Sequence, residues 1–120
     1  MPYVDGFVLA VPKANIEAYK KMATLGRDVW MSHGALSYVE AIADDVPYGE
    51  LTSFPRAVQA KDDEVVFFSW ITFKDRESRD AINKKVMEDP RMSGGEYTKD
   101  NMPFDGKRMI YGGFQAVVEG

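Results

Sequence analysis

The chain has 120 residues, of which 45% are hydrophobic and 28% charged, and it carries a formal net charge of −4. These values predict one globular domain over residues 1–120 with a sizeable core. The acidic balance and the scattered lysines and arginines argue against a nucleic-acid partner. The absence of cysteine excludes disulfides, thiolate nucleophiles and cysteine-ligated metal centres.

The first residues lack a basic segment followed by an apolar one, so no secretory signal is expected. The longest apolar run is well short of the ~20 residues that a membrane helix needs. We therefore expect a cytoplasmic protein that has no membrane partner.

The first expected elements are a strand over residues 3–12 and a helix over residues 15–33. Apolar side chains occupy both faces of the strand. Asn15 is the expected N-cap of the helix, and Gly34 is its expected stop. Gly26 falls on the apolar stripe of the helix, which indicates a close approach of helix to sheet.

Further strands are expected over residues 35–43, 51–60 and 65–73. Pro55 cannot donate a hydrogen bond to a ladder, so the strand 51–60 is expected at an edge of the sheet. The strand 65–73 reads Val-Val-Phe-Phe-Ser-Trp-Ile-Thr-Phe and is apolar on both faces. Both of its faces must therefore be covered.

Asp75 is the expected cap of a second helix over residues 76–88. A long connection over residues 91–105 follows, and connections of this length are often lids or interface arms. A last strand is expected over residues 107–118.

This order of elements predicts an α+β domain of the ferredoxin-like βαββαβ type, with an antiparallel sheet and an extra edge strand. Two helices can cover only one face of such a sheet. The other face would expose an apolar patch of a size that is rare on a monomer. We therefore expect a homodimer in which two sheets pack face to face across a two-fold axis.

The motifs that carry a family resemblance cover essentially the whole chain: residues 3–12, Trp30 with 33–36, 38–40, 44–47, 52–57, 68–70 and 102–114. They resemble the YbaA-like bacterial family, which is catalogued as a domain of unknown function. The resemblance implies membership of the dimeric α+β barrel superfamily. It implies a fold and an oligomer, and no established activity.

Relatives in that superfamily include cofactor-independent monooxygenases, haem-degrading enzymes and small-ligand binders. The haem-degrading branch uses an Asn, a Trp and a helical His. This chain has Trp70 on a central strand, but its first strand carries Asp5, and its only histidine, His33, lies in the first helix. Haem degradation is therefore not carried over, and no cofactor is expected.

His33, Asp5 and Glu40 are the candidate catalytic residues. His33 is a possible general base or axial haem ligand, although a helix-end histidine that hydrogen-bonds the backbone is the commoner case. Asp5 and Glu40 interrupt otherwise apolar faces. A carboxylate that points into a barrel needs a partner or a raised pKa, so we expect at least one of the two to lie in a cavity.

The alternative for these two carboxylates is pairing with arginine or lysine, with Arg56, Lys107 and Arg108 as the expected partners. Arg108 is also a candidate ligand-binding residue. No acidic run has the spacing of a calcium loop, so no metal site is expected.

Trp70, Tyr38 and Tyr111 are candidates for an aromatic ligand pocket inside the barrel. Strand aromatics in a two-sheet core more often serve packing. Ser69 and Trp70 lie at the middle of the central strand on opposite faces. Whichever of them faces the barrel interior is the better candidate for touching a ligand.

Three functions remain open from the sequence. The first is a dimer that binds a small apolar or aromatic molecule in the barrel. The second is a cofactor-independent, monooxygenase-like enzyme. The third is a structural or partner-interaction dimer with a filled interior.

Overall fold

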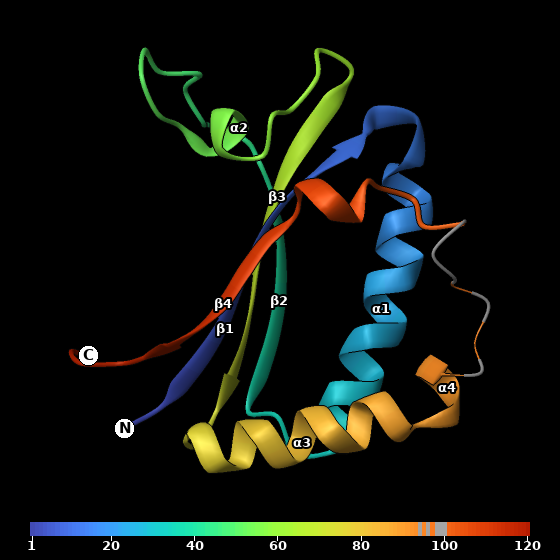
Figure 1. Ribbon diagram of the computed structural model, residues 1–120, viewed down its shortest axis with the longest axis vertical. Coiled ribbons are helices and arrows are strands. Elements are labelled where there is room, and N and C mark those ends of the chain that lie inside the picture. Colours follow the sequence, from blue (N-terminus) through green and yellow to red (C-terminus); the bar gives the residue numbers. More distant parts are fainter. Residues whose placement is uncertain (94, 96, 98–100) are drawn as a thin grey trace.

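The computed structural model describes residues 1–93, 95, 97 and 101–120. Strands and helices follow one another along the chain (Figure 1). In order they are β1 Tyr3–Pro12, η1 Lys13–Asn15, α1 Ile16–Ser32, β2 Ser37–Ile42, α2 Phe54–Ala57, β3 Glu64–Phe73, α3 Arg76–Glu88, α4 Pro90–Ser93, η2 Gly106–Arg108 and β4 Ile110–Gln115.

The strands form one four-stranded sheet in the order β2-β3-β1-β4. Every neighbouring pair is antiparallel. The long central strands β1 and β3 pair along their whole length, from Tyr3 opposite Phe73 to Pro12 opposite Glu64. With one helix after β1 and another after β3, this is the predicted ferredoxin-like α+β fold.

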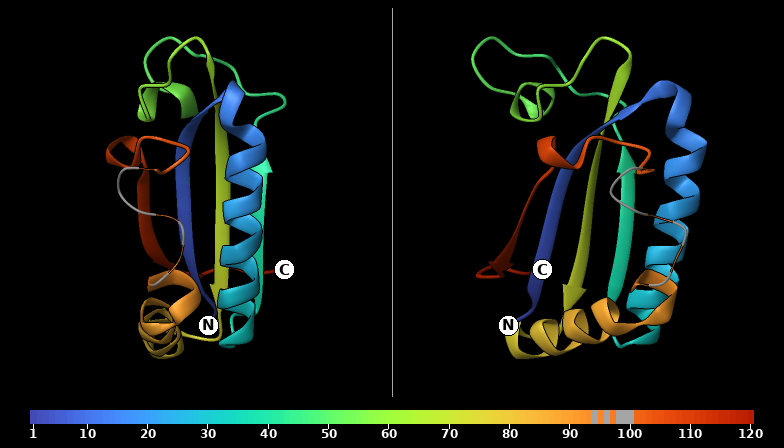
Figure 2. Two further views of the ribbon diagram at one scale, coloured as in Figure 1. Left: turned by 90° about the vertical axis from the view of Figure 1, so that its right-hand side faces the viewer. Right: turned by 45° about the vertical axis from the view of Figure 1, so that its right-hand side comes forward.

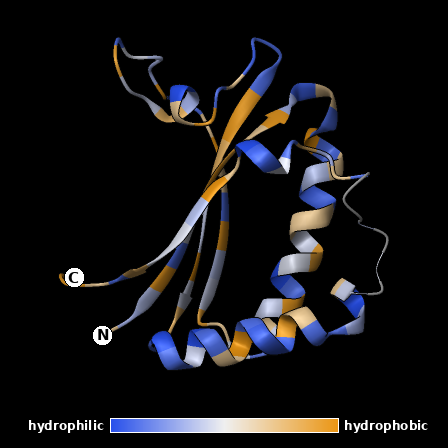
Figure 3. Ribbon diagram, viewed as in Figure 1, coloured by the Kyte–Doolittle hydropathy of each residue, from blue (hydrophilic) through white to orange (hydrophobic). Residues whose placement is uncertain are grey.

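The helices α1 and α3 cover one face of the sheet, as the views in Figure 2 show. The core on this side holds buried side chains of the two central strands, including Leu9, Val11, Phe67 and Phe73. Hydrophobic residues are concentrated within β3 and at the end of β1 (Figure 3). Along α3, hydrophilic and hydrophobic residues alternate. The alternation leaves α3 with one buried and one wet side.

The predicted edge strand over residues 51–60 is wrong, because its centre forms the short helix α2. The hydroxyl of Ser53 caps α2 by accepting from the backbone N–H of Arg56 at 3.1 Å. Pro55 stands in the first turn, where its missing N–H costs nothing. A serine followed two residues later by proline was therefore a helix start and not a strand.

The segment that contains α2 covers part of the second face of the sheet. Val58 joins Val8, Ala10 and Val66 in a small buried cluster, and the ring of Phe54 packs edge-on against Phe68 with centroids 5.7 Å apart. Figure 1 shows α2 across the sheet from α1. The remainder of this face is open in the single chain.

Two other boundaries differ from the sequence predictions. The last strand spans Ile110–Gln115 instead of residues 107–118, because η2 takes up its expected start. The side chain of Asn15 does not cap α1; its Nδ2 donates to the carbonyl oxygen of Pro103 at 3.0 Å. The predicted cap of α3 is confirmed, since Asp75 Oδ1 accepts from the N–H of Ser78 at 2.7 Å.

Candidate functional site

A cavity of about 330 Å³ lies between α1 and the sheet. Its lining is mostly apolar and aromatic: Phe7, Leu9, Tyr19, Met22, Ala23, Gly26, Trp30, Tyr38, Glu40, Ser69, Trp70, Ile71, Met92, Tyr97, Met102, Phe104 and Met109. One carboxylate, Glu40, stands among these residues. The cavity therefore has an apolar body and one polar end.

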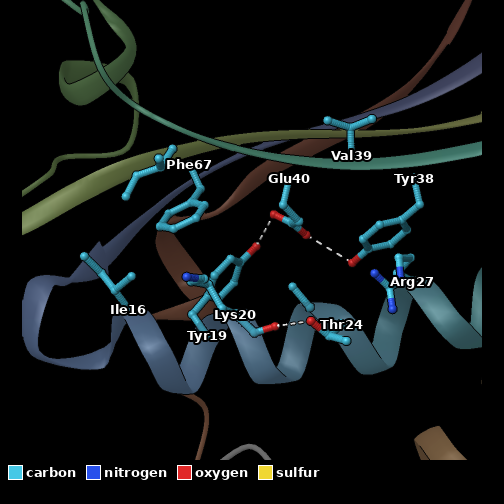
Figure 4. Close-up of a pocket in the computed structure, with 11 residues that line it drawn as sticks. Ile16, Tyr19, Lys20, Thr24, Arg27, Tyr38, Val39, Glu40 and Phe67 are labelled. Carbon is cyan, nitrogen blue, oxygen red and sulfur yellow. Dashed lines mark hydrogen bonds between the residues drawn. The ribbon is translucent and has the colours of Figure 1, made fainter.

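Two tyrosine hydroxyls converge on Glu40 at this polar end. Tyr19 reaches from α1 and donates to Oε1 at 2.7 Å, and Tyr38 of β2 donates to Oε2 at 3.0 Å (Figure 4). We call Tyr19, Tyr38 and Glu40 the carboxylate cluster. Each carboxylate oxygen thus has its own phenol donor.

The strand period and the sheet register assemble this cluster. Tyr38 and Glu40 are two residues apart on β2, so both point toward α1, while Val39 between them points away (Figure 4). Ser69 of β3 lies opposite Glu40 in the register and is buried. Ser69 therefore shares the helix-facing side of the sheet with Glu40.

Gly26 makes room for the cluster on α1. A Cβ atom built at this position would lie 2.9 Å from the hydroxyl oxygen of Tyr38. The close approach that the sequence predicts at Gly26 is therefore to the tip of a sheet side chain, the phenol of Tyr38, which lies in the space that a larger residue would need.

Burial sets the electrostatics of the cluster. Loss of solvent raises the pKa of Glu40 above its ordinary value, and the hydrogen bonds from Tyr19, Tyr38 and Ser69 oppose that rise. Burial and the neighbouring Glu40 raise the pKa of both tyrosines far above the ordinary value. Both phenols therefore stay protonated and act as donors to the carboxylate.

A second hollow, a groove of about 510 Å³, lies on the outer side of the cluster between α1 and β2. Ala23 and the three residues of the carboxylate cluster border both this groove and the cavity. The side chains of Lys20, Thr24 and Arg27 stand along the rim of the groove (Figure 4). The cluster thus forms the partition between an interior space and an outer one.

The predicted long connection over residues 91–105 contributes to the cavity wall. Tyr97, Met102 and Phe104 line the cavity, and the ring of Phe104 meets Tyr19 edge-on with centroids 5.7 Å apart. Residues 94, 96 and 98–100 of this predicted connection lie outside the described residues.

The sequence offered Ser69 and Trp70, neighbours on β3, as alternative residues facing the interior. Ser69 faces the helices and lines the cavity. Trp70 borders both the cavity and a hollow on the opposite face. Its ring packs against Phe68 on that opposite face, with centroids 5.6 Å apart. Ser69 is therefore the residue whose side chain faces the cavity.

Tyr111 and Arg108 lie outside the cavity lining. Tyr111 stacks with Phe7 at a centroid distance of 6.2 Å and is 72% exposed on the edge strand β4. Arg108 forms ion pairs with Glu64 at 2.7 Å and Asp105 at 3.0 Å. These carboxylates raise the pKa of Arg108 and tie η2 to the start of β3.

Asp5 is buried in an ion pair that the sequence did not predict. Its carboxylate accepts from Nε of Arg79 at 3.0 Å and from Nδ2 of Asn83 at 3.2 Å. Asn83 Oδ1 in turn accepts from Nε1 of Trp30 at 2.9 Å. The sequence predicted Arg56, Lys107 or Arg108 as the partner of Asp5. That prediction is wrong, because α3 brings Arg79 over β1.

His33 joins the ends of two helices. Its Nε2 lies 2.8 Å from Oδ2 of Asp89, and Arg91 pairs with the same carboxylate at 2.8 Å. These two neighbours hold the pKa of Asp89 well below its usual range. The bond is to a side chain and not to the expected backbone group, and His33 does not line the cavity or the groove.

Tyr19 is the member of the cluster that sequence reasoning missed. It lies on the apolar stripe of α1, where a tyrosine is usually a packing residue. The available signal was its hydroxyl, since a buried phenol needs a partner. Glu40, which interrupts an apolar strand face, was the acceptor to match with it.

The described residues hold no group of three or more histidines and carboxylates placed to bind a metal ion. Within the same residues, no helix has both the length and the apolar character that crossing a bilayer requires.

Comparison with known proteins identifies close relatives. A family model described as "Protein of unknown function (DUF1428)" matches residues 2–106. The chain is 50% identical over 119 residues to "Uncharacterized protein YbaA" of Escherichia coli K12 and of Shigella flexneri, with 99% of each chain covered. A crystal structure of a dimeric ferredoxin-like protein from an uncultured marine organism matches with a TM-score of 0.54 at 15% identity, over all of both chains.

Proposed function

Since the chain belongs to the DUF1428 family, a family of unknown function, we propose from its geometry that it is a homodimer whose subunits each bind a small apolar or aromatic molecule. The binding site is the cavity between α1 and the sheet. No chemical step is part of this proposal.

The cavity is the observation that carries the proposal. Its volume of about 330 Å³ falls within the range of roughly 300–1,000 Å³ that is typical of small-molecule sites. Sites of this kind combine an apolar wall with a few converging polar groups. The carboxylate cluster and Ser69 supply those polar groups.

A filled interior would favour a structural dimer, and the cavity argues against it. The monooxygenase-like alternative needed Trp70, Tyr38, His33 and an acidic residue around one space. The cavity receives Tyr38 and Glu40 and is bordered by Trp70, whose ring packs against Phe68 on the other face, whereas His33 lies at the helix junction and outside the cavity. Binding is thus better supported than that enzyme.

The open face of the sheet supports the homodimer. Phe68 and Phe114 are 41% and 64% exposed there, and the hollow between them has no charged residue in its lining: Val4, Gly6, Phe7, Val8, Phe68, Trp70, Ile110, Tyr111, Gly112 and Phe114. An uncharged apolar surface of this kind marks an interaction site. A second copy presents the same apolar surface, and the ferredoxin-like relative of known structure is described as dimeric.

A dye titration with a cavity-filling variant tests the ligand site. N-phenyl-1-naphthylamine is a neutral apolar dye whose fluorescence rises in an apolar pocket. We expect wild type to bind it and Ala23→Phe, which places a ring in the cavity, to lose binding. The control Ala81→Phe makes the same change at an exposed position of α3 and should bind as wild type does.

Circular dichroism and thermal unfolding establish that both variants are folded. Unchanged dye binding in a folded Ala23→Phe protein would place the dye elsewhere and contradict the proposed site.

A further inference from the structure

The carboxylate cluster at the polar end of the cavity offers a ligand only hydrogen-bond acceptors. Tyr19 and Tyr38 each have a single hydroxyl proton, and each donates it to Glu40, at 2.7 and 3.0 Å. A phenol whose proton is engaged can only accept from a ligand, and an ionised carboxylate has acceptor sites alone. Ser69, which lies opposite Glu40 in the sheet register, also lowers the pKa of that carboxyl.

Glu40 also lacks a counter-ion. Three other carboxylates, whose side chains are less than one-tenth exposed, each pair with an arginine: Asp5 with Arg79, Glu64 with Arg108 and Asp89 with Arg91. Glu40 takes part in no ion pair within the described part of the chain. A half-buried carboxylate without a cation is costly, and a cationic ligand would offset that cost.

The remainder of the cavity suits an apolar or aromatic body. Met22, Met102 and Phe104 form part of its wall, and Trp30 adds a second large ring. Aromatic faces also attract ammonium groups. A ligand with a cationic head and an apolar body therefore finds a matching surface for each of its parts.

We propose that the cavity binds an amine carried on an apolar or aromatic body, in its ammonium form. The N–H groups donate to Glu40 and to the hydroxyl oxygens of Tyr19 and Tyr38. This inference rests on the proposed function, since it specifies the molecule that the cavity holds. A carboxylate or phosphate ligand would meet acceptors only and be rejected.

The test compares three probes that share a phenethyl group and differ in the head. Phenethylamine is cationic at pH 7, 2-phenylethanol is neutral, and 3-phenylpropionate is anionic. Calorimetric titration should show the amine binding about tenfold or more tightly than the alcohol, as expected of a charge-assisted hydrogen bond. The carboxylate should not bind.

The variant Glu40→Gln removes the charge and keeps the shape. We expect it to weaken the amine about tenfold or more and to leave the alcohol within about threefold. The matched control Glu50→Gln removes the same charge from an exposed loop position and should bind all three probes as wild type does.

A measurement on wild type guards against a poorly folded variant. Amine binding should weaken as the pH falls and Glu40 becomes protonated, while alcohol binding should not change. Alcohol or carboxylate binding as tight as the amine would overturn the amine inference and leave the cavity as a binding site. Failure of all three probes to bind would overturn this inference and count against the proposed function.

Discussion

The carboxylate of Asp5 on β1 lies 3.0 Å from Nε of Arg79 on α3, and Asn83 on the same helix gives that carboxylate a second donor. This contact holds α3 against β1. It also closes the end of the sheet nearest the chain's first residues, since Arg79 lies over the ring of Tyr3 at 5.2 Å.

Replacing Arg79 by Met should destabilise the fold by about 3 kcal/mol, because it leaves the buried Asp5 carboxylate without its cation. Urea unfolding measures the change. The matched control is Arg76→Met on the same helix, whose pair with Asp80 is long at 3.8 Å and exposed. That change should cost less than about 0.5 kcal/mol. Equal losses for both variants would show that the buried pair has no special role.

Gly26→Ala should destabilise the protein by about 1–2 kcal/mol although alanine is the better helix former by about 1 kcal/mol. The reason is the hydroxyl of Tyr38, which the added Cβ would approach to 2.9 Å. In a Tyr38→Phe background the obstructing oxygen is gone. There Gly26→Ala should be neutral or stabilising by about 1 kcal/mol. A double-mutant cycle from urea unfolding tests this, and an identical loss in both backgrounds would contradict it.

The stability of the wild type should fall relative to Glu40→Gln as the pH rises above the ordinary Glu value of 4.5. Burial raises the pKa of Glu40 in the folded protein, so the folded state binds the proton more tightly than the unfolded state does. The stabilisation from that proton is complete below 4.5 and is lost as the pH rises through the folded pKa.

Urea unfolding of both proteins between pH 4 and pH 7, at steps of half a pH unit, gives this difference directly. Other carboxylates, such as Glu64 and Asp89, have lowered pKa values and act in the opposite direction. They are common to both proteins and cancel. A difference that does not depend on pH would show that Glu40 titrates as it does in the unfolded chain.

Phe68→Glu should convert the proposed dimer into a monomer at micromolar concentration, because it places a charge on the apolar face that the second copy would cover. Light scattering coupled to size-exclusion chromatography measures the mass. The control Leu51→Glu makes the same change at a loop position that is 88% exposed and should remain a dimer. A monomeric wild type would refute the interface.

The central strands β1 and β3 and the helix α3 could be predicted from local sequence. The strand over residues 3–12 and the helix over residues 76–88 match the structure residue for residue, because a short apolar run and an aspartate cap are strong local signals. The resemblance to the YbaA-like family was confirmed by the comparisons. The failure over residues 51–60 arose where an extended-looking run contained a local helix cap.

The candidate site was predictable only in part. Glu40 stood out as a carboxylate on an apolar strand face. The sequence predicted that Asp5 or Glu40 would lie in a cavity, and Glu40 lines one. Its partnership with Tyr19 depends on how α1 lies across the sheet, which no short-range pattern encodes. The same is true of Asp5 and Arg79, which are brought together from positions 74 residues apart.

The partition between the cavity and the outer groove has a kinetic consequence. The groove lies beside exposed Lys20, Thr24 and Arg27 on one side of the carboxylate cluster, and the cavity lies on the other. If the proposed amine occupies the cavity, protons would still reach Glu40 from the side of the groove. In the proposed complex the charge of Glu40 would then follow the external pH, so acidification would loosen a bound amine without first requiring the chain to open.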